Sequence, residues 1–112
     1  MRKPNNGKDL DIPKGLTRKG RKAAAIIKKF MAKNHLETGG CRTFYTPQEW
    51  RDRGESYGTR SLLVFVYDGG DLYGIANMHC GYKLHEELVE KLGEIGVYFE
   101  CCTGWYSAIY EG

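Results

Sequence analysis

RSLLVFVY, at residues 60–67, is the most continuous apolar stretch of this 112-residue chain. From Leu62 to Tyr67 the apolar side chains occupy consecutive positions, so a strand formed here is apolar on both faces. Such a strand is typical of the centre of a sheet. We therefore expect residues 60–67 to form the central strand of the fold.

Other strands are predicted on both sides of this stretch. Asp68-Gly69-Gly70-Asp71 is a turn signal, and residues 72–78 are expected to return as the hairpin partner of the central strand. Residues 97–102 and 105–110 predict a second hairpin, and residues 41–45 a short strand before the central one. The sequence thus favours a sheet of about five strands.

Three helices are expected between these strands. The first begins after Thr17 as N-cap and runs to about His35, before Thr38-Gly39-Gly40. The second starts at Thr46-Pro47-Gln48-Glu49, a capping-box pattern with proline at the first position, and ends by Gly54. The third covers about residues 83–93. The order α-β-α-β-β-α-β-β predicts an α+β fold, a largely antiparallel sheet with helices mainly on one face.

One domain and a leader are predicted. Residues 1–15 contain two prolines and two glycines and only two large aliphatic residues, Leu10 and Ile12. We expect them to be a flexible basic leader, followed by a single α+β domain at 16–112. The longest apolar run spans six residues, far short of the about 20 of a membrane helix. Without an apolar stretch after the basic start there is no secretory signal, so we predict a cytoplasmic protein without a membrane partner.

Positive charge is concentrated in the first third of the chain. Residues 1–35 carry eleven Lys or Arg against Asp9 and Asp11, a net charge of +9, whereas residues 36–112 carry −6. Such asymmetry is typical of a basic segment with an acidic partner. That partner is a nucleic acid, another protein, or the acidic body of the same chain.

The first predicted helix separates its cations from its apolar residues. At 100° per residue, one arc collects the apolar side chains Ala23, Ile26, Ile27, Phe30 and Met31. The opposite arc collects the cations Arg18, Arg21, Lys22, Lys28, Lys29 and Lys33. A row of cations on one helix face suits a phosphate backbone, and a solvated surface is the alternative interpretation.

Aromatic residues are concentrated in the hairpins. Strand alternation places Trp105, Ser107 and Ile109 on one face of the last strand and Tyr106, Ala108 and Tyr110 on the other, which Tyr98 joins from the neighbouring strand. If helices cover one side of the sheet only, Tyr98, Tyr106 and Tyr110 face solvent, where tyrosines stack bases or anchor a protein interface. The alternative is that they pack in the core or in a homodimer interface.

Catalytic and metal-binding patterns are not recognisable. Cys41, Cys80, Cys101 and Cys102 lack the paired spacing of zinc sites, and Cys101 and Cys102 point to opposite faces of a strand. We expect reduced thiols, no metal and no cofactor. Cys80 with His79 or His85 as a base, and the carboxylates Asp68, Asp71 and Glu100, are weaker hypotheses for an enzyme.

The sequence therefore predicts a small non-enzymatic protein that binds nucleic acid or another polyanion through its basic arm and first helix. The alternative is a protein-interaction module, an inhibitor or adaptor, that uses the aromatic sheet face and the acidic third helix. Glu86, Glu87, Glu90 and Glu94 make that helix acidic.

Overall fold

A computed structural model describes residues 11–36, 42–67, 82–103 and 105–112. Within these ranges the chain has an α+β fold with a four-stranded antiparallel sheet and three helices. In chain order the elements are α1 (Arg18–Lys33), β1 (Phe44–Tyr45), α2 (Pro47–Asp52), β2 (Leu63–Val66), α4 (Tyr82–Gly93), β3 (Val97–Cys101) and β4 (Tyr106–Glu111). The predicted strand at 72–78 and most of the predicted leader lie outside the described residues.

The strand order is β1-β2-β4-β3, and each neighbouring pair is antiparallel. β2 lies between β1 and β4, and all four of its residues are buried, so the prediction of a central strand is confirmed. β2 is shorter than residues 60–67, although backbone hydrogen bonds extend its pairing at both ends. The Leu62 amide donates to the Ile109 carbonyl at 2.7 Å, and the Tyr67 amide donates to the Trp105 carbonyl at 3.0 Å.

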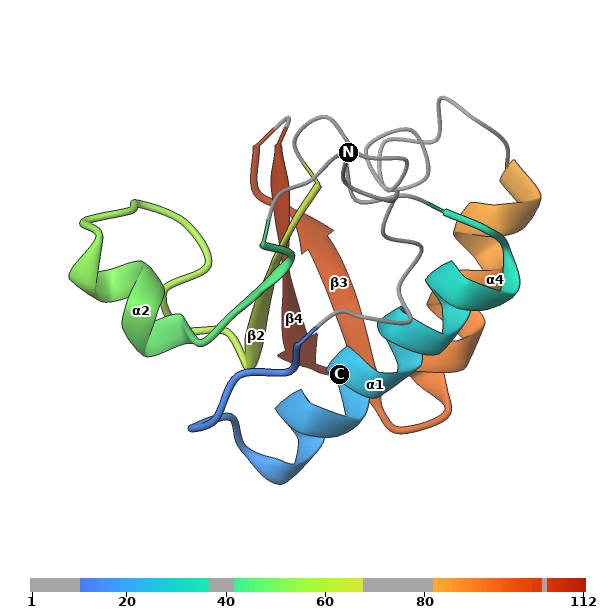
Figure 1. The fold of residues 1–112 in the computed structure, drawn as a ribbon, viewed down its shortest axis with the longest axis horizontal. Helices are drawn as coiled ribbons and strands as arrows, with labels where there is room; N and C mark the ends of the chain where they lie inside the picture. The colour runs from blue at the N-terminus through green and yellow to red at the C-terminus, as the bar shows by residue number, and fades with distance from the viewer. Residues whose placement is uncertain (1–10, 37–41, 68–81, 104) are drawn as a thin grey trace, which may run out of the picture.

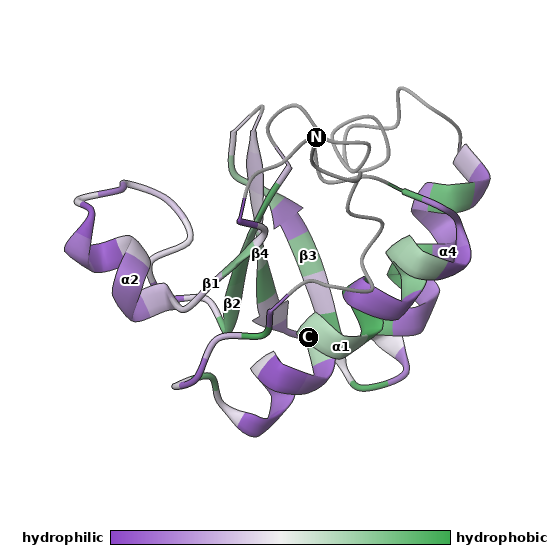
Figure 2. Ribbon diagram, in the orientation of Figure 1, coloured by the Kyte–Doolittle hydropathy of each residue, from purple (hydrophilic) through white to green (hydrophobic). Residues whose placement is uncertain are grey.

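Helices lie on both faces of the sheet. In Figure 1, α1 and α4 lie on one side of the strands and α2 on the other. Alternation along β2 explains this: Leu63 and Phe65 pack in the larger core under α1 and α4, whereas Val64 and Val66 pack with Trp50 of α2. Figure 2 shows hydrophobic residues along β2 and β4 and mostly hydrophilic residues along α2. Two of the three helices share a face, and α2 forms a small second core on the opposite one.

α1 begins and packs as its sequence predicts. The Thr17 hydroxyl accepts a hydrogen bond from the Gly20 amide at 3.1 Å, which caps the first turn. The buried side of the helix contains Ala23, Ala24, Ile27, Phe30 and Met31, while Ile26 is partly buried against the same core. At Gly20 the helix lies close to the backbone just before β2, because a Cβ atom there would lie 2.6 Å from the Leu62 carbonyl oxygen.

The end of α1 lies two residues before the predicted limit of about His35. The helix ends at Lys33, with Asn34 as C-cap, and His35 has a left-handed φ of 54°. The Leu36 amide then donates to the Met31 carbonyl at 2.9 Å, and the Leu36 side chain is buried in the core. The chain reversal therefore occurs at a residue that tolerates positive φ, ahead of the predicted glycine signal.

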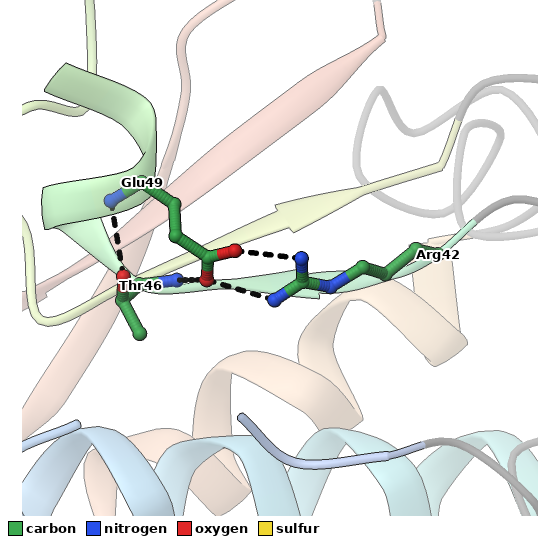
Figure 3. Close-up of polar contacts among 3 residues, drawn as sticks. All are labelled: Arg42, Thr46 and Glu49. Carbon is green, nitrogen blue, oxygen red and sulfur yellow. Dashed lines mark hydrogen bonds and ion pairs between the residues drawn. The ribbon is translucent and has the colours of Figure 1, made fainter. Parts of the chain in front are cut away.

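The capping box of α2 is confirmed. The Thr46 hydroxyl accepts from the Glu49 amide, and the Glu49 carboxylate accepts from the Thr46 amide, both at 3.0 Å (Figure 3). Arg42 donates two further hydrogen bonds to the same carboxylate, at 2.6 and 2.7 Å (Figure 3). The pKa of Glu49 is lowered, chiefly by the hydrogen bond from Arg42. This network joins the strand β1 to the start of α2.

α4 and the final hairpin complete the larger core. Leu88 and Leu92 of α4 are buried and Leu84 is partly buried, whereas Val89 is 43% exposed. β3 and β4 form the predicted hairpin, in register Phe99↔Ile109. No helix within the described ranges is long and apolar enough to cross a bilayer.

Candidate functional site

The cations predicted to form one surface lie along the outer side of α1. Lys28 is half-buried and the others are exposed. Within the described part of the chain, Lys33 is the one member of this set that makes an ion pair. We use the name cationic face for the set Arg18, Arg21, Lys22, Lys28, Lys29 and Lys33.

The acidic helix α4 touches the cationic face at its C-terminal end. Lys33 Nζ lies 3.5 Å from a carboxylate oxygen of Glu87, to which the Asn34 side-chain amide also donates at 3.4 Å. Glu86, Glu90 and Glu94 are exposed and make no ion pair with described residues. The chain's own acidic helix therefore neutralises one end of the cationic face and leaves the rest open.

A small hollow lies at the seam between α1 and α4, with a volume of about 180 Å³. Its lining residues are Ile26, Lys29, Phe30, Lys33, Lys91 and Glu94. Lys91 thus joins two cations of α1, a placement missed by sequence reasoning because it depends on how α4 packs beside α1. The hollow combines an apolar floor with a net positive rim.

The opposite end of the cationic face reaches the end of the sheet. Lys19 of α1 is half-buried and lies 3.8 Å from the Glu111 carboxylate at the end of β4. At 100° per residue, Lys19 lies on the same side of the helix as the apolar residues, which is the side that faces the sheet. The contact with Glu111 connects the N-terminal half of α1 to the ends of β3 and β4.

The three tyrosines predicted to form an aromatic contact have different environments. Tyr106 is 1% exposed, and its hydroxyl donates to the Tyr57 carbonyl at 3.2 Å, so it belongs to the second core. Burial raises its pKa. Tyr98 is 45% exposed and Tyr110 is half-buried, and their ring centroids are 5.8 Å apart. Only Tyr98 and Tyr110 remain accessible to a ligand.

Trp105 lies on a different side from the one that alternation predicts. It precedes β4 and packs against Trp50 and Tyr106, at ring-centroid distances of 5.7 and 4.6 Å. Strand alternation does not govern a residue outside the strand. The Arg53 guanidinium lies 4.5 Å from the Trp50 ring centroid and covers this cluster from the solvent side.

A larger hollow of about 510 Å³ lies on the same face of the sheet as Tyr110. One wall is the loop at 56–60 and the other is the hairpin β3–β4, and the lining residues are Ser56, Tyr57, Gly58, Thr59, Arg60, Glu100, Cys101, Cys102 and Tyr110. Sequence reasoning did not find this hollow, because the loop and the hairpin are about 40 residues apart in the chain. It offers aromatic rings, hydroxyls and one charge of each sign.

The adjacent thiols point to opposite sides of the sheet, as predicted. Cys101 Sγ lies 3.6 Å from both the Tyr67 and the Ser107 hydroxyls, whereas Cys102 packs with the second core. Burial, with smaller effects of Glu100 and Cys101, raises the pKa of Cys102 to about 11, which keeps it a neutral thiol and a poor nucleophile near pH 7.

Most residues of the weaker enzymatic hypotheses lie in parts of the chain that the structure does not describe. Cys41, Cys80, His79, Asp68 and Asp71 lie outside the described residues. Among the residues that are described, no group of three or more His, Cys, Asp and Glu is placed to hold a metal ion.

Comparison with protein-family models, with curated proteins and with solved structures yields no significant match for this chain.

Proposed function

We propose that this protein binds nucleic acid or another polyanion through the cationic face of α1. The observation that carries the proposal is that most cations of this face are not paired with described carboxylates. Five of its six cations make no ion pair with any described residue, although the acidic helix α4 lies directly beside α1. A charged surface of this kind attracts a ligand with repeated negative charges.

The seam between the helices adds to this surface. Lys29, Lys33 and Lys91 surround a hollow whose floor is Ile26 and Phe30. Glu94 on the rim and Glu87, which pairs with Lys33, offset two of the three charges, so the hollow keeps a net positive charge. One backbone phosphate suits such a hollow, because both of its non-bridging oxygens can accept hydrogen bonds from ammonium groups on the rim.

Backbone contacts of this kind position a nucleic acid without reading its sequence. Each neutralised phosphate releases counterions, and the logarithm of the binding constant falls by about 0.7–0.9 per contact for each logarithmic unit of salt. If all five unpaired cations engage phosphates, affinity decreases roughly 100- to 500-fold between about 50 and about 200 mM salt.

Fluorescence anisotropy with a labelled oligonucleotide tests the proposal directly. We expect binding at about 50 mM salt that weakens steeply as salt increases. Heparin, a polyanion without bases, should compete. The absence of any association with nucleic acid or heparin at low salt contradicts the proposed function.

A second candidate function is binding to a basic protein through α4. Two large apolar side chains are exposed on this helix, Tyr82 at 64% and Val89 at 43%. They are seven residues apart and therefore share one side, with Glu86 between them. An apolar pair flanked by carboxylates suits a partner whose surface is apolar and basic.

Val89→Lys separates the two functions. It places a cation at the centre of the acidic, apolar side of α4 and should abolish capture of a stoichiometric protein partner. Binding to labelled DNA should stay intact or strengthen slightly. A partner whose capture survives nuclease treatment and is lost in Val89→Lys supports the second candidate.

A further inference from the structure

We propose that the polyanion is a single-stranded nucleic acid, one base of which stacks on Tyr98 and Tyr110 while the next occupies the hollow between the 56–60 loop and the hairpin. This inference rests on the proposed function and specifies its ligand.

The first observation is the aromatic pair. Tyr98 and Tyr110 are directly opposite in the antiparallel pair β3–β4, and their ring planes are inclined by 31°. They lie on the sheet face opposite to α1 and α4, because they alternate with Phe99 and Ile109 of the larger core. β3 lies at one edge of the sheet formed by the described strands. On this face, Trp50 of α2 packs over β2 and the start of β4 rather than over the two tyrosines. The pair is therefore a solvent-facing aromatic surface.

The second observation is that the hollow beside this pair is already formed. Tyr110 is part of its lining, so the stacking surface and the hollow are continuous. The 56–60 loop is held by three hydrogen bonds: Tyr106 donates to the Tyr57 carbonyl, Arg51 to the Thr59 carbonyl, and the Ser61 hydroxyl to the Gly58 carbonyl. A volume of about 510 Å³ is in the range of pockets that take small organic molecules.

Gly58 explains how this loop approaches the sheet so closely. Its φ is +79°, and a Cβ atom there would lie 3.3 Å from Ala108 Cβ and 3.5 Å from a Val64 methyl group. The loop therefore rests on the sheet through a residue without a side chain.

The charges of the hollow favour a base over a phosphate. Arg60 and Glu100 contribute one charge of each sign, and Ser56 and Thr59 contribute hydroxyls. A carboxylate in the wall repels phosphate, whereas the mixed donors and acceptors match the edge of a base. Burial raises the pKa of Tyr110, so its hydroxyl remains protonated and can donate.

The phosphates can be held at the adjacent end of the sheet. Lys19 reaches Glu111 there, one residue beyond Tyr110, and a Cβ atom on Gly112 would lie 3.9 Å from the Tyr98 ring. Arg18 and Lys22 of the cationic face lie in the same half of α1 as Lys19. A strand that crosses this end of the sheet can thus keep its phosphates near Arg18 and Lys22 and place its bases on the tyrosines of the opposite face. Paired bases in a duplex cannot reach such a surface, since they are stacked and hydrogen-bonded within the helix.

Tyr98→Ala tests the inference against Tyr82→Ala as the matched control, since Tyr82 is also exposed but lies on α4. Binding of a labelled oligothymidine, a duplex of the same length, and heparin is measured at low salt by anisotropy. We expect Tyr98→Ala to weaken oligothymidine binding roughly 5- to 150-fold, with duplex and heparin unchanged. Tyr98→Phe keeps the ring and should bind as the original protein does.

Ser56→Leu tests the hollow separately, because it fills the hollow without a change of charge. We expect selective weakening of oligothymidine binding. If Tyr98→Ala and Ser56→Leu bind oligothymidine as tightly as the original protein while heparin still binds, this inference is overturned and the proposed function stands. If the original protein binds neither heparin, duplex nor single-stranded DNA, both this inference and the proposed function are overturned.

Discussion

Lys33 of α1 and Glu87 of α4 form an ion pair at 3.5 Å, and Asn34 donates to the same carboxylate. Within the described residues, this pair and Lys19–Glu111 are the two ion pairs between the basic segment 1–35 and the acidic remainder of the chain. A chain with net charges of opposite sign in its two parts can mask its own cations. Here the contact involves the last turn of α1, and the other five residues of the cationic face make no ion pair with described residues.

Removing charge from the open part of the cationic face should weaken polyanion binding. We expect the combined variant Arg21→Gln, Lys22→Gln and Lys29→Gln to lower the slope of log affinity against log salt by about two to three. Lys83→Gln removes an exposed cation from α4 and is the control. The measurement is anisotropy over a salt series. An unchanged slope in the combined variant would exclude α1 as the contact surface.

Glu87→Gln should have the opposite effect on binding. It frees Lys33 for a ligand, so we expect roughly 1.5- to 5-fold tighter binding and a steeper salt slope, with a stability loss below about 1 kcal/mol. Glu86→Gln removes the same charge from the neighbouring position, where no ion pair with described residues exists. If both variants bind equally tightly, the Lys33–Glu87 contact has no specific role and only net charge matters.

Gly20→Ala should destabilise the fold even though alanine favours helices. The added methyl group would lie 2.6 Å from the Leu62 carbonyl oxygen, so α1 must move away from β2. We expect a loss of about 1–3 kcal/mol in the free energy of unfolding. Gly93→Ala, at the end of α4 with nothing within 4 Å, should be neutral or stabilising by up to about 1 kcal/mol. Urea denaturation of both variants gives the comparison, and a stable Gly20→Ala variant would disprove the close approach.

The Glu49 network should make part of the stability depend on acid pH. The pKa of Glu49 is lower in the folded chain than in the unfolded one, chiefly because Arg42 donates to its carboxylate. Its contribution is therefore complete above the unfolded pKa of about 4.3 and is lost as pH falls through the lower folded value. Since both side chains are partly exposed, we expect a contribution below about 1 kcal/mol.

The comparison of the original protein with Glu49→Gln checks this. Their difference in unfolding free energy, measured by urea denaturation, should be constant from pH 7 to about 5 and shrink below about pH 4. A difference that grows on acidification would contradict the assigned direction of the pKa shift. Glu55→Gln, whose partner Arg53 also covers Trp50, offers a second ion pair for comparison.

Local patterns were sufficient to predict most secondary structure. Thr17 and Thr46 were identified as N-caps because their hydroxyls bond amides within three residues, and those contacts depend on neighbouring positions only. The central position of β2 followed from consecutive apolar residues. The exact ends of β2 could not be predicted in this way, because its pairing depends on which residues of β1 and β4 lie opposite.

In the candidate site, too, local patterns predicted some features, while others depend on tertiary contacts. The cationic face could be predicted, since the helical period alone places Arg21, Lys22 and Lys29 on the side away from Phe30. The accessibility of the tyrosines could not be predicted. Strand alternation places Tyr106 and Tyr110 on the same face, but Trp50 covers Tyr106 and not Tyr110. The hollow at 56–60 was not foreseen either.

By itself, then, the sequence determined the helices with their caps, the central strand, the final hairpin and the separation of charge along α1. Tertiary structure decided that α2 lies on the opposite sheet face from α1 and α4, that Lys33 is paired, and that Tyr98 stays exposed. The reason is physical: capping and periodicity act between residues a few positions apart. Burial and ion pairing instead depend on which distant segments meet once the apolar faces have packed.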